Sequence, residues 1–487
     1  TFTHPHPLYN AQTLRVLEAR MAGNLPPHTL MQRAGLSVAR LAMAIAPHAK
    51  CIWIACGPGN NGGDGFEAAL HLHQWGKSVV VTCSDDESKL PADATLSLGR
   101  ARAAHVEFRH EPPDHPDLCI DALLGIGSSR PSTGKMAEWL ARMASCQAPV
   151  LCVDLPTGLN ANTGKNSSNL TANYLYQNCR NKVFTLTFLG LKPGLFTHQG
   201  RDACGEIWWD DLGASTAVCD VKPDAWLAGP SPVQRQAHAS HKGSYGDVLV
   251  VGGDTGMLGA AMLAADAALH AGAGRVYVSL LDLNAAQWDS QRPALMFRNW
   301  QTLDLSKLTL VCGCGGGTAT ADILTQAIPL AGHLVMDADA LNQLATDLNL
   351  QTMLVARGAS GKPTVLTPHP LEAARLLGTS VATVQSDRLK AALQLAERYQ
   401  CTVALKGSGT VVASQDNLPS INPTGNARLA TAGTGDVLAG LVGARLAHGL
   451  PPREAAMSAA WQHGFVADLW PAKQALTADQ LAQSLLR

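Results

Sequence analysis

A glycine-rich segment that ends in a carboxylate, residues 431–436 (Thr-Ala-Gly-Thr-Gly-Asp), runs directly into an apolar stretch at 437–442. Glycines let backbone N–H groups converge without Cβ crowding, and a helix that begins here would add its unpaired N–H groups and positive dipole end. The spacing predicts an anion-binding cradle with Asp436 at its rim. Because a carboxylate repels an anion, Asp436 is suited to take a proton from a hydroxyl that faces the anion. The alternative is a glycine-rich helix cap with Asp436 as an N-cap residue.

A second glycine-rich segment lies at residues 57–65 and has the sequence Gly-Pro-Gly-Asn-Asn-Gly-Gly-Asp-Gly. An apolar stretch at 51–56 precedes it, a helical pattern at 66–75 follows, and another apolar stretch lies at 78–82. This order predicts a strand–helix–strand unit whose loop lies at the carboxyl end of a strand, where open α/β sheets bind ligands. The spacing differs from the GxGxxG dinucleotide fingerprint and from a phosphate-binding P-loop.

Two acidic residues of the first half accompany apolar strands. Asp121 lies inside one apolar segment, and Asp154 follows another. Because strand ends converge at one edge of a doubly wound sheet, we expect both carboxylates near Asn61 and Thr157. Their oxygen atoms are hard ligands, which suit an alkali or alkaline-earth cation better than zinc.

Two segments of the second half also place polar groups after apolar strands. Residues 364–367 lead to His369, which stands between two prolines that stiffen the turn. This position favours a ligand contact over an exposed turn histidine. Residues 402–405 lead into residues 406–410, Lys-Gly-Ser-Gly-Thr, whose amine, amide and hydroxyl groups suit a nucleotide phosphate or ribose.

The chain has 487 residues, more than one core usually holds, and both halves repeat the strand–helix–strand order. We therefore predict two α/β domains at 1–212 and 223–487, with a linker at 213–222 where periodicity is weak. The net charge of −1 and the aromatic content of 5% argue against nucleic acid as a partner.

Cysteine usage and hydropathy bear on the compartment of the protein. The 12 cysteines lack a paired CxxC spacing and are interpreted as reduced thiols of a cytoplasmic protein. No apolar run reaches the roughly 18 residues that span a bilayer, so no membrane partner is expected. The first residues have neither the basic nor the apolar region of a secretory signal.

The motifs of the first half together resemble those of the NAD(P)H-hydrate epimerase domain. They are residues 57–65, Asp121 with residues 125–131, and the Asp-Leu-Pro-Thr-Gly segment at 154–158. The resemblance covers roughly residues 8–212 and implies a Rossmann-like three-layer sandwich that interconverts the R and S forms of hydrated NADH or NADPH.

The same resemblance implies functional residues. Asp154 would contact the substrate and serve in proton transfer, and a K⁺ ion would be held by Asn61, Asp121 and Thr157. The hydrate pocket would be lined by Asn60, Asn61, Gly62, Gly63, Asp64, Gly125, Ile126, Gly127, Ser128, Ser129, Arg130 and Pro131.

Residues 406–410 and 433–436, which follow repeated strand–helix units, resemble the ribokinase-like superfamily. More narrowly, the segments KGSYGDVLVVGG, GMLGAAMLAA, DADALN, TPHPLEAARLL and KGSGT resemble the ADP-dependent NAD(P)H-hydrate dehydratase over nearly all of residues 225–487. The resemblance implies a nucleotide site made of Lys406, Gly407, Ser408, Gly409, Thr410 and Gly435. It also implies Mg²⁺, ADP as co-substrate, and hydrate contacts from Ala260, Gly317, His369 and Asp436.

Two segments depart from these family patterns. Residues 166–183 are more polar than expected before the strand at 184–188. Residues 312–317 (Cys-Gly-Cys-Gly-Gly-Gly) replace the usual Gly-Pro-Gly-Leu-Gly, although the glycine spacing is kept.

The two resemblances imply a bifunctional enzyme, an isomerase and lyase that repairs hydrated NADH and NADPH. The first half would epimerise the hydrate, and the second would dehydrate the S form with ADP, giving AMP and phosphate. One alternative is a ribokinase-like kinase of a small alcohol, such as a vitamin precursor, with a nucleotide-binding N-terminal module. Another is an N-terminal half that only binds a ligand and scaffolds partners. We expect a homo-oligomer.

Overall fold

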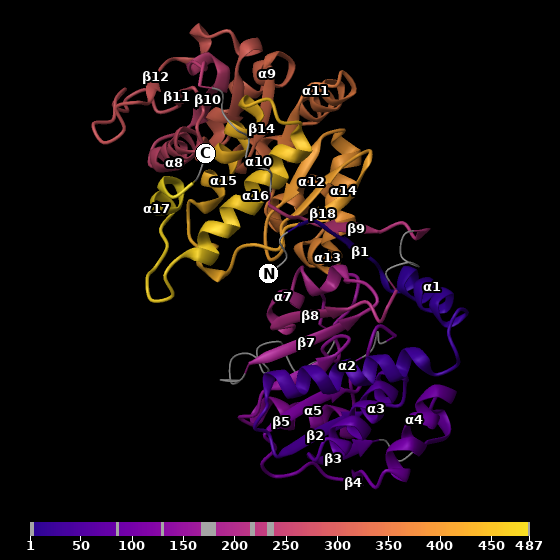
Figure 1. Ribbon diagram of the computed structural model, residues 1–487. Coiled ribbons are helices and arrows are strands. Elements are labelled where there is room, and N and C mark those ends of the chain that lie inside the picture. Colours follow the sequence, from indigo (N-terminus) through magenta and orange to yellow (C-terminus); the bar gives the residue numbers. More distant parts are fainter. Residues whose placement is uncertain are drawn as a thin grey trace. The chain divides into compact units, whose positions relative to one another are not determined.

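The computed structural model describes residues 4–83, 87–127, 131–166, 182–214, 220–230 and 238–485. The chain divides into an N-terminal unit of Pro7–Ala225 and a C-terminal unit of Thr1–His6 with Trp226–Arg487 (Figure 1). The domain limits and the linker proposed from the sequence stay a prediction, and residues 215–219 of that linker lie outside the described residues.

The N-terminal unit contains a sheet of parallel strands in the order β4-β3-β2-β5-β6-β7-β8. The strands are β2 (Cys51–Cys56), β3 (Ser78–Cys83), β4 (Glu107–Phe108), β5 (Leu118–Ala122), β6 (Val150–Val153), β7 (Val183–Phe188) and β8 (Glu206–Asp210). The helices are α1 (Ala11–Ala22), α2 (Thr29–Ile45), α3 (Asn60–Gln74), α4 (Ala92–Ala103), α5 (Lys135–Ser145) and α7 (Gly200–Ala203).

Apolar side chains cover both faces of this sheet. Successive residues of a strand point to opposite faces, so Ile52 and Ile54 join one apolar cluster with α1 to α4, whereas Trp53 joins another with Trp139 of α5. Helices therefore lie on both faces, which confirms the predicted Rossmann-like three-layer sandwich.

The glycine-rich segment at 57–65 differs from the prediction in one respect. We expected a loop followed by a helix from residue 66, but α3 begins at Asn60. The glycines allow close packing within this helical start. A Cβ on Gly62 would lie 2.0 Å from the carbonyl oxygen of Gly57, and one on Gly63 would lie 2.5 Å from the sulfur of Met31. Tertiary packing therefore outweighs the low helix propensity of glycine.

The C-terminal unit contains a mixed sheet, whose order among the described residues is β1-β9-β18-β17-β16-β15-β14-β13-β10-β11-β12. Its central strands are parallel, and β16, β17 and β18 are antiparallel neighbours. The strands are β1 (His6–Leu8), β9 (Ala225–Leu227), β10 (Asp247–Gly252), β11 (Arg275–Leu280), β12 (Met296–Phe297), β13 (Thr309–Cys312), β14 (His333–Met336), β15 (Thr364–Leu366), β16 (Thr402–Leu405), β17 (Val411–Ser414) and β18 (Asn417–Ile421).

Helices surround this sheet, which confirms the predicted α/β class. They are α8 (Leu258–His270), α9 (Thr320–Leu330), α10 (Ala338–Thr346), α11 (Leu348–Ala359), α12 (Pro370–Leu377), α13 (Val381–Ser386), α14 (Arg388–Tyr399), α15 (Thr434–Ala447), α16 (Pro452–Leu469) and α17 (Ala478–Gln483). Figure 1 shows α8, α15, α16 and α17 on one side of the sheet, where they share an apolar core. Gly440 allows α15 to approach α8, since a Cβ there would lie 2.0 Å from the carbonyl oxygen of Ala264.

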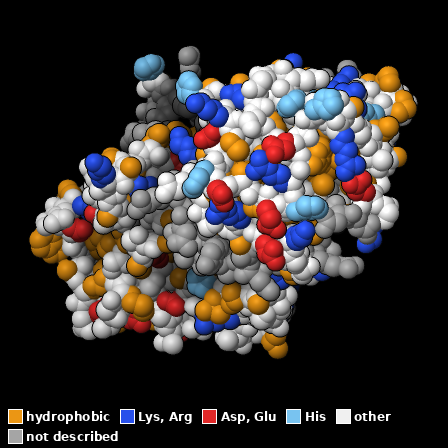
Figure 2. Space-filling view, turned by 90° about the horizontal axis from the view of Figure 1, so that it is seen from below, with side chains coloured by type: hydrophobic (Ala, Val, Ile, Leu, Met, Phe, Trp, Pro, Cys, Tyr) orange, Lys and Arg blue, Asp and Glu red, His pale blue; other side chains and the backbone are white. Residues whose placement is uncertain are grey.

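The surface agrees with the nearly neutral net charge of the chain. On the face shown in Figure 2, basic and acidic side chains lie interspersed. None of the helices described is both long and apolar enough to cross a bilayer.

Candidate active sites

A cavity of about 860 Å³ lies in the N-terminal unit, at the carboxyl ends of its central strands. Eight residues expected from the family resemblance line it: Asn60, Asn61, Asp64, Gly125, Ile126, Gly127, Pro131 and Asp154. Gly62 and Gly63 instead face protein atoms in the packed start of α3. Ser128, Ser129 and Arg130 lie outside the described residues.

The predicted cation ligands Asp121 and Thr157 are in direct contact. The Thr157 hydroxyl donates to Asp121 Oδ1 at 2.7 Å, and the Thr157 backbone N–H donates to Oδ2 at 3.0 Å. Burial raises the pKa of the Asp121 carboxyl, although its hydrogen bonds act in the opposite direction. A cation would offset this cost, so the pair fits a site for a hard cation.

Asn61 lies at the rim of the same cavity. The position of a Cβ on Gly125 would be 3.3 Å from Asn61 Oδ1 and 3.5 Å from Asp154 Oδ2, which places both side chains beside this glycine. Among the described residues, the buried Nδ2 of Asn61 has no hydrogen-bond partner. A buried amide without a partner is costly, so a ligand at the rim would complete it.

Asp154 forms an ion pair that was not anticipated. Its backbone is in the left-handed region, with φ of 66°. Lys192 Nζ lies 2.5 Å from Asp154 Oδ1 and also donates to Thr187 Oγ1 at 2.7 Å and to the Phe188 carbonyl at 3.0 Å. Lys192 is 1% exposed, and burial lowers the pKa of its amine even though Asp154 opposes the effect. The only signal in the sequence was a lysine inside an otherwise apolar turn.

In the C-terminal unit, α15 begins within the glycine-rich segment that the sequence singled out. Gly433 precedes the helix with φ of 89°, and Asp436 lies in the first turn. The side chains of Asp436, Asp337 and Cys314 place ligand atoms within 4.8 Å of one another. Burial, and then the nearby charge of Asp337, raise the pKa of Asp436 to about 6. A carboxylate with this pKa is ionised at neutral pH but is more basic than an exposed one.

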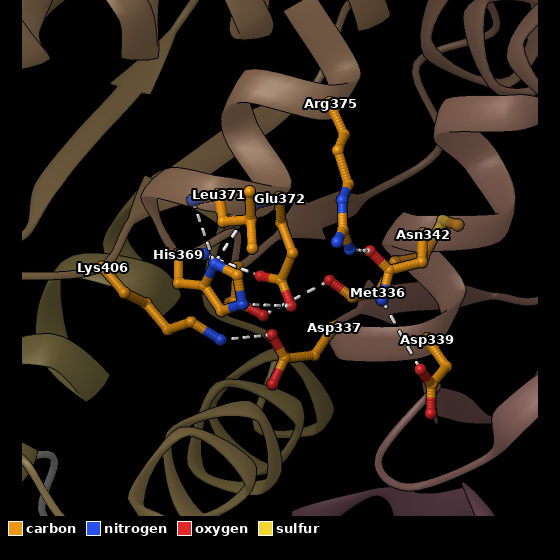
Figure 3. A network of polar contacts seen from close by, with 10 residues as sticks. Met336, Asp337, Asp339, Asn342, His369, Leu371, Glu372, Arg375 and Lys406 are labelled. Atoms are coloured by element: carbon orange, nitrogen blue, oxygen red, sulfur yellow. Dashed lines mark hydrogen bonds and ion pairs between the residues drawn. The ribbon is translucent and has the colours of Figure 1, made fainter. Parts of the chain in front are cut away.

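The side chain of Lys406 lies close to both Asp337 and Gly435, the second residue of α15. Its Nζ is 2.5 Å from Asp337 Oδ1 and 3.4 Å from the position of a Cβ on Gly435 (Figure 3). Burial would lower the pKa of Lys406, but the charges of Asp337 and Glu372 outweigh it and raise the pKa. The structure therefore holds a charged ammonium beside the first turn of α15.

His369 is the N-cap residue of α12. Its Nδ1 accepts from the backbone N–H groups of Leu371 and Glu372, each at 3.1 Å. Since Nδ1 is an acceptor, Nε2 carries the proton and faces Glu372 Oε1 at 3.2 Å. Burial raises the pKa of Glu372 to about 7, and burial followed by the charge of Lys406 lowers that of His369. Figure 3 shows both side chains beside Lys406 and Asp337.

The other two expected hydrate contacts are Gly317, in the turn after β13, and Ala260, in helix α8. Gly317 has φ of 54°, and its N–H donates to Asp339 Oδ2 at 2.9 Å. Ala260 lies in the first turns of α8, 2.9 Å from the position of a Cβ on Gly315. The glycine spacing at 312–317 therefore brings this loop against α8.

The loop at residues 406–410 connects β16 to β17 and contains two glycines in the left-handed half of φ space. Gly407 has φ of 134° and Gly409 has φ of 67°. The side chain of Lys406 extends from this loop to Asp337, so one element joins the predicted nucleotide site to the region of Asp436. Sequence reasoning placed Lys406 and the DADALN strand end, which begins with Asp337, at this site, but it did not single out Cys314 or Glu372.

Known proteins match both units of the chain. The family described as NAD(P)H-hydrate dehydratase matches residues 248–487, and the YjeF-related protein N-terminus matches residues 27–194. The bifunctional NAD(P)H-hydrate repair enzyme of Escherichia coli (strain K12) is 34% identical, and the alignment covers 96% of this chain and 90% of that protein. The chain belongs to the family of bifunctional NAD(P)H-hydrate repair enzymes. This confirms the resemblance predicted from the motifs of both halves.

Other members of the NAD(P)H-hydrate repair family match over most of their length. The enzyme of Gloeobacter violaceus is 36% identical, with 98% of this chain and 97% of that protein covered. Among solved structures, the ADP/ATP-dependent NAD(P)H-hydrate dehydratase of Bacillus subtilis, co-crystallised with ATP and Mg²⁺, is 27% identical with a TM-score of 0.42. That comparison covers 51% of this chain and 91% of the other.

Proposed function

We propose that this chain repairs hydrated NADH and NADPH, with one step in each unit. The N-terminal unit epimerises the R and S forms of the hydrate, and the C-terminal unit dehydrates the S form with ADP. Membership in the repair family supports the pair of activities. The observation that carries the dehydration step is the half-buried carboxylate of Asp436 in the first turn of α15, near the ammonium of Lys406.

In the dehydration step, Asp436 accepts the proton of the substrate hydroxyl as that oxygen attacks the terminal phosphorus of ADP. The bond from this phosphorus to the bridging oxygen breaks and AMP leaves. The ring nitrogen then supplies the electron pair that expels phosphate from the new ester, which leaves a C=N bond and a positive charge on the nitrogen. Loss of a proton from the neighbouring ring carbon to the released phosphate forms the C=C double bond and returns the electron pair to the nitrogen. Lys406 and the N–H groups at the start of α15 stabilise the negative charge that develops on the phosphoryl oxygens.

The side chains around the cradle fit a magnesium ion. Asp337 offers a carboxylate beside Gly435, and hard oxygen ligands suit Mg²⁺, whereas the thiol of Cys314 does not. Bound there, Mg²⁺ would neutralise charge on the phosphates of ADP. The nucleotide itself would be held by the loop at 406–410 and by Gly435.

In the epimerisation step, Asp154 accepts the hydroxyl proton as the bond from the hydroxyl-bearing carbon to the ring nitrogen breaks and a carbonyl forms. The nitrogen then adds back to the other face of the carbonyl, and Asp154 returns the proton to the oxygen. Lys192 holds this carboxylate through its ion pair and faces the same cavity. Asp121, Thr157 and the amide of Asn61 would hold a K⁺ ion, which would supply positive charge near the pocket. A homo-oligomeric state and the domain limits at 212 and 223 are further parts of this proposal.

The purified full-length chain tests the proposal directly. It is incubated with the S hydrate, with ADP or without nucleotide, and recovery of NADH absorbance is followed. We expect recovery only with nucleotide, and formation of AMP in equal amount. A hydroxymethyl-pyrimidine substrate with ATP tests the kinase alternative. Phosphorylation of that alcohol without any dehydration of the hydrate would contradict the proposal.

A further inference from the structure

A fully buried guanidinium lies directly under the loop at residues 406–410. Arg388 is the first residue of α14 and is 1% exposed. Its Nη2 donates to the carbonyl oxygens of Leu405 at 3.1 Å, of Lys406 at 3.1 Å and of Gly409 at 3.4 Å. Its Nη1 donates to Gln385 Oε1 at 2.8 Å, and this second hydrogen bond fixes the orientation of the guanidinium. The carbonyl of the last residue of β16 and two carbonyls of the loop thus converge on one side chain.

The direction of these carbonyl groups decides the direction of the following amides. In a trans peptide the C=O of one residue and the N–H of the next point to opposite sides. The N–H of Lys406 follows the carbonyl of Leu405 and donates away from Arg388, to the Pro368 carbonyl at 2.8 Å. By the same geometry the N–H groups of Gly407 and Thr410, which follow the other two carbonyls, point away from the guanidinium.

Gly407 lets the loop come close enough for these contacts. A Cβ on this residue would lie 2.9 Å from Nη1 and 3.1 Å from Nη2 of Arg388, and its φ of 134° disfavours any other residue. The glycine therefore serves the approach of the loop to Arg388. Burial lowers the pKa of Arg388 to about 10, so the group stays charged at neutral pH and adds positive potential beneath the loop.

We propose that Arg388 is a positioning residue for ADP, which orients the N–H groups of Gly407 and Thr410 toward the phosphates by holding the carbonyls behind them. This inference rests on the proposed nucleotide site at 406–410. Arg388 acts through the loop, because its Nη2 donates to backbone carbonyls at and before the loop. A lysine is a poor replacement, because its single nitrogen cannot bond the carbonyls and Gln385 from the two separate nitrogens of a planar guanidinium.

The chain offers a matched control in Arg357. This residue of α11 is 3% exposed, and burial lowers its pKa to about 10 as well. It donates to the carbonyls of Ile328 at 2.9 Å, Ala331 at 2.7 Å and Pro363 at 2.9 Å. Pro363 directly precedes β15 and so lies at the amino-terminal end of the parallel strands, whereas the loop at 406–410 follows the carboxyl end of β16. Arg357→Lys therefore removes a similar buried fork without touching the proposed site.

The experiment compares the wild-type full-length chain with Arg388→Lys and Arg357→Lys. The readouts are the dissociation constant for ADP by calorimetry, KM for ADP and for the hydrate, kcat, epimerase activity and melting temperature. We expect Arg388→Lys to raise the ADP dissociation constant and KM about tenfold, the loss typical of a charged hydrogen-bond donor. The KM for hydrate and the epimerase activity should stay unchanged. Arg357→Lys should lower the melting temperature without changing the dissociation constant or the KM for ADP.

Amide hydrogen exchange of residues 406–410 gives a readout that does not need nucleotide, and it should become faster only in Arg388→Lys. Should Arg388→Lys fail to fold, Gly407→Ala is the second variant, because its added Cβ displaces the loop from the same guanidinium. It should raise the dissociation constant for ADP in the same way. Equal ADP affinity in wild type and Arg388→Lys, both folded, would overturn the role of Arg388 alone. A wild-type chain that neither binds ADP nor dehydrates the hydrate would instead overturn the proposed function.

Discussion

Both units contain an aspartate and a lysine 2.5 Å apart near the carboxyl ends of parallel strands. The two pairs differ in whether the aspartate bound by the lysine is itself the proposed catalytic base. In the N-terminal unit Lys192 binds the proposed base, Asp154, itself. In the C-terminal unit Lys406 binds Asp337, and the proposed base Asp436 lies beside that pair. Burial dominates at Lys192 and lowers its pKa, whereas neighbouring carboxylates dominate at Lys406 and raise its pKa.

This difference suggests how each base is prepared. An ammonium in direct contact orients the carboxylate of Asp154. Asp436 lies beside another carboxylate, which together with burial raises its pKa to about 6 and strengthens it as a base. Epimerisation would then depend on an oriented anion, and dehydration on a carboxylate of raised basicity. Four variants test this contrast.

The largest effect is expected from Asp436→Ala. Loss of the general base should lower kcat for dehydration by about 10²- to 10⁴-fold. Epimerisation should be unaffected, because Asp436 belongs to the other unit. Asp154→Ala is the reciprocal control. Both rates are measured on the same preparation, and dehydration at near wild-type rate in Asp436→Ala would refute its role as the base.

A smaller but still large effect is expected from Lys192→Met. Removing one partner of a buried ion pair leaves Asp154 uncompensated, which costs about 3 kcal/mol or more. The melting transition of the N-terminal unit in scanning calorimetry should move to lower temperature, and epimerisation should slow. Lys192→Arg keeps the charge and should recover part of the stability. A transition that stays at the wild-type temperature in Lys192→Met would argue against the ion pair.

Asp337→Asn should move the pH dependence of dehydration. The base must be ionised, so kcat/KM should fall as the pH drops through about 6 in the wild type. Removing the negative charge of Asp337 lowers the pKa of Asp436, so this acidic limb should shift to lower pH by about one unit. The pH profile of epimerisation serves as the control. A limb that moves to higher pH would contradict the proposed influence of Asp337 on Asp436.

The smallest effect is expected from Glu372→Gln. Burial raises the pKa of Glu372 from 4.5 to about 7 in the folded chain. The folded state therefore binds this proton more tightly than the unfolded state, and the stabilisation is lost as the pH rises from about 4.5 through about 7. In Glu372→Gln the melting temperature of the C-terminal unit should fall less across this range. An unchanged pH dependence would show that Glu372 ionises normally.

Much of both sites could be predicted because it rests on local patterns. Glycines before an apolar helix indicated the start of α15, a polar residue inside an apolar strand indicated Asp121, and polar residues after apolar strands indicated Asp154 and His369. The contact between Asp121 and Thr157 followed from the convergence of strand ends. The residues that were missed, Lys192 among them, are distant in sequence from the groups they serve or lack a motif of their own.

The amino-acid sequence by itself determined the α/β class, the two sets of motifs, the family and the place of the Asp436 cradle, because short-range spacing and hydrophobic periodicity carry that information. Only the tertiary structure decided which lysine pairs with which aspartate, that α3 begins at Asn60, and that Arg388 lies beneath the loop at residues 406–410. The physical reason is that ion pairing and glycine packing depend on burial and on long-range contacts. No local pattern in the chain specifies either of them.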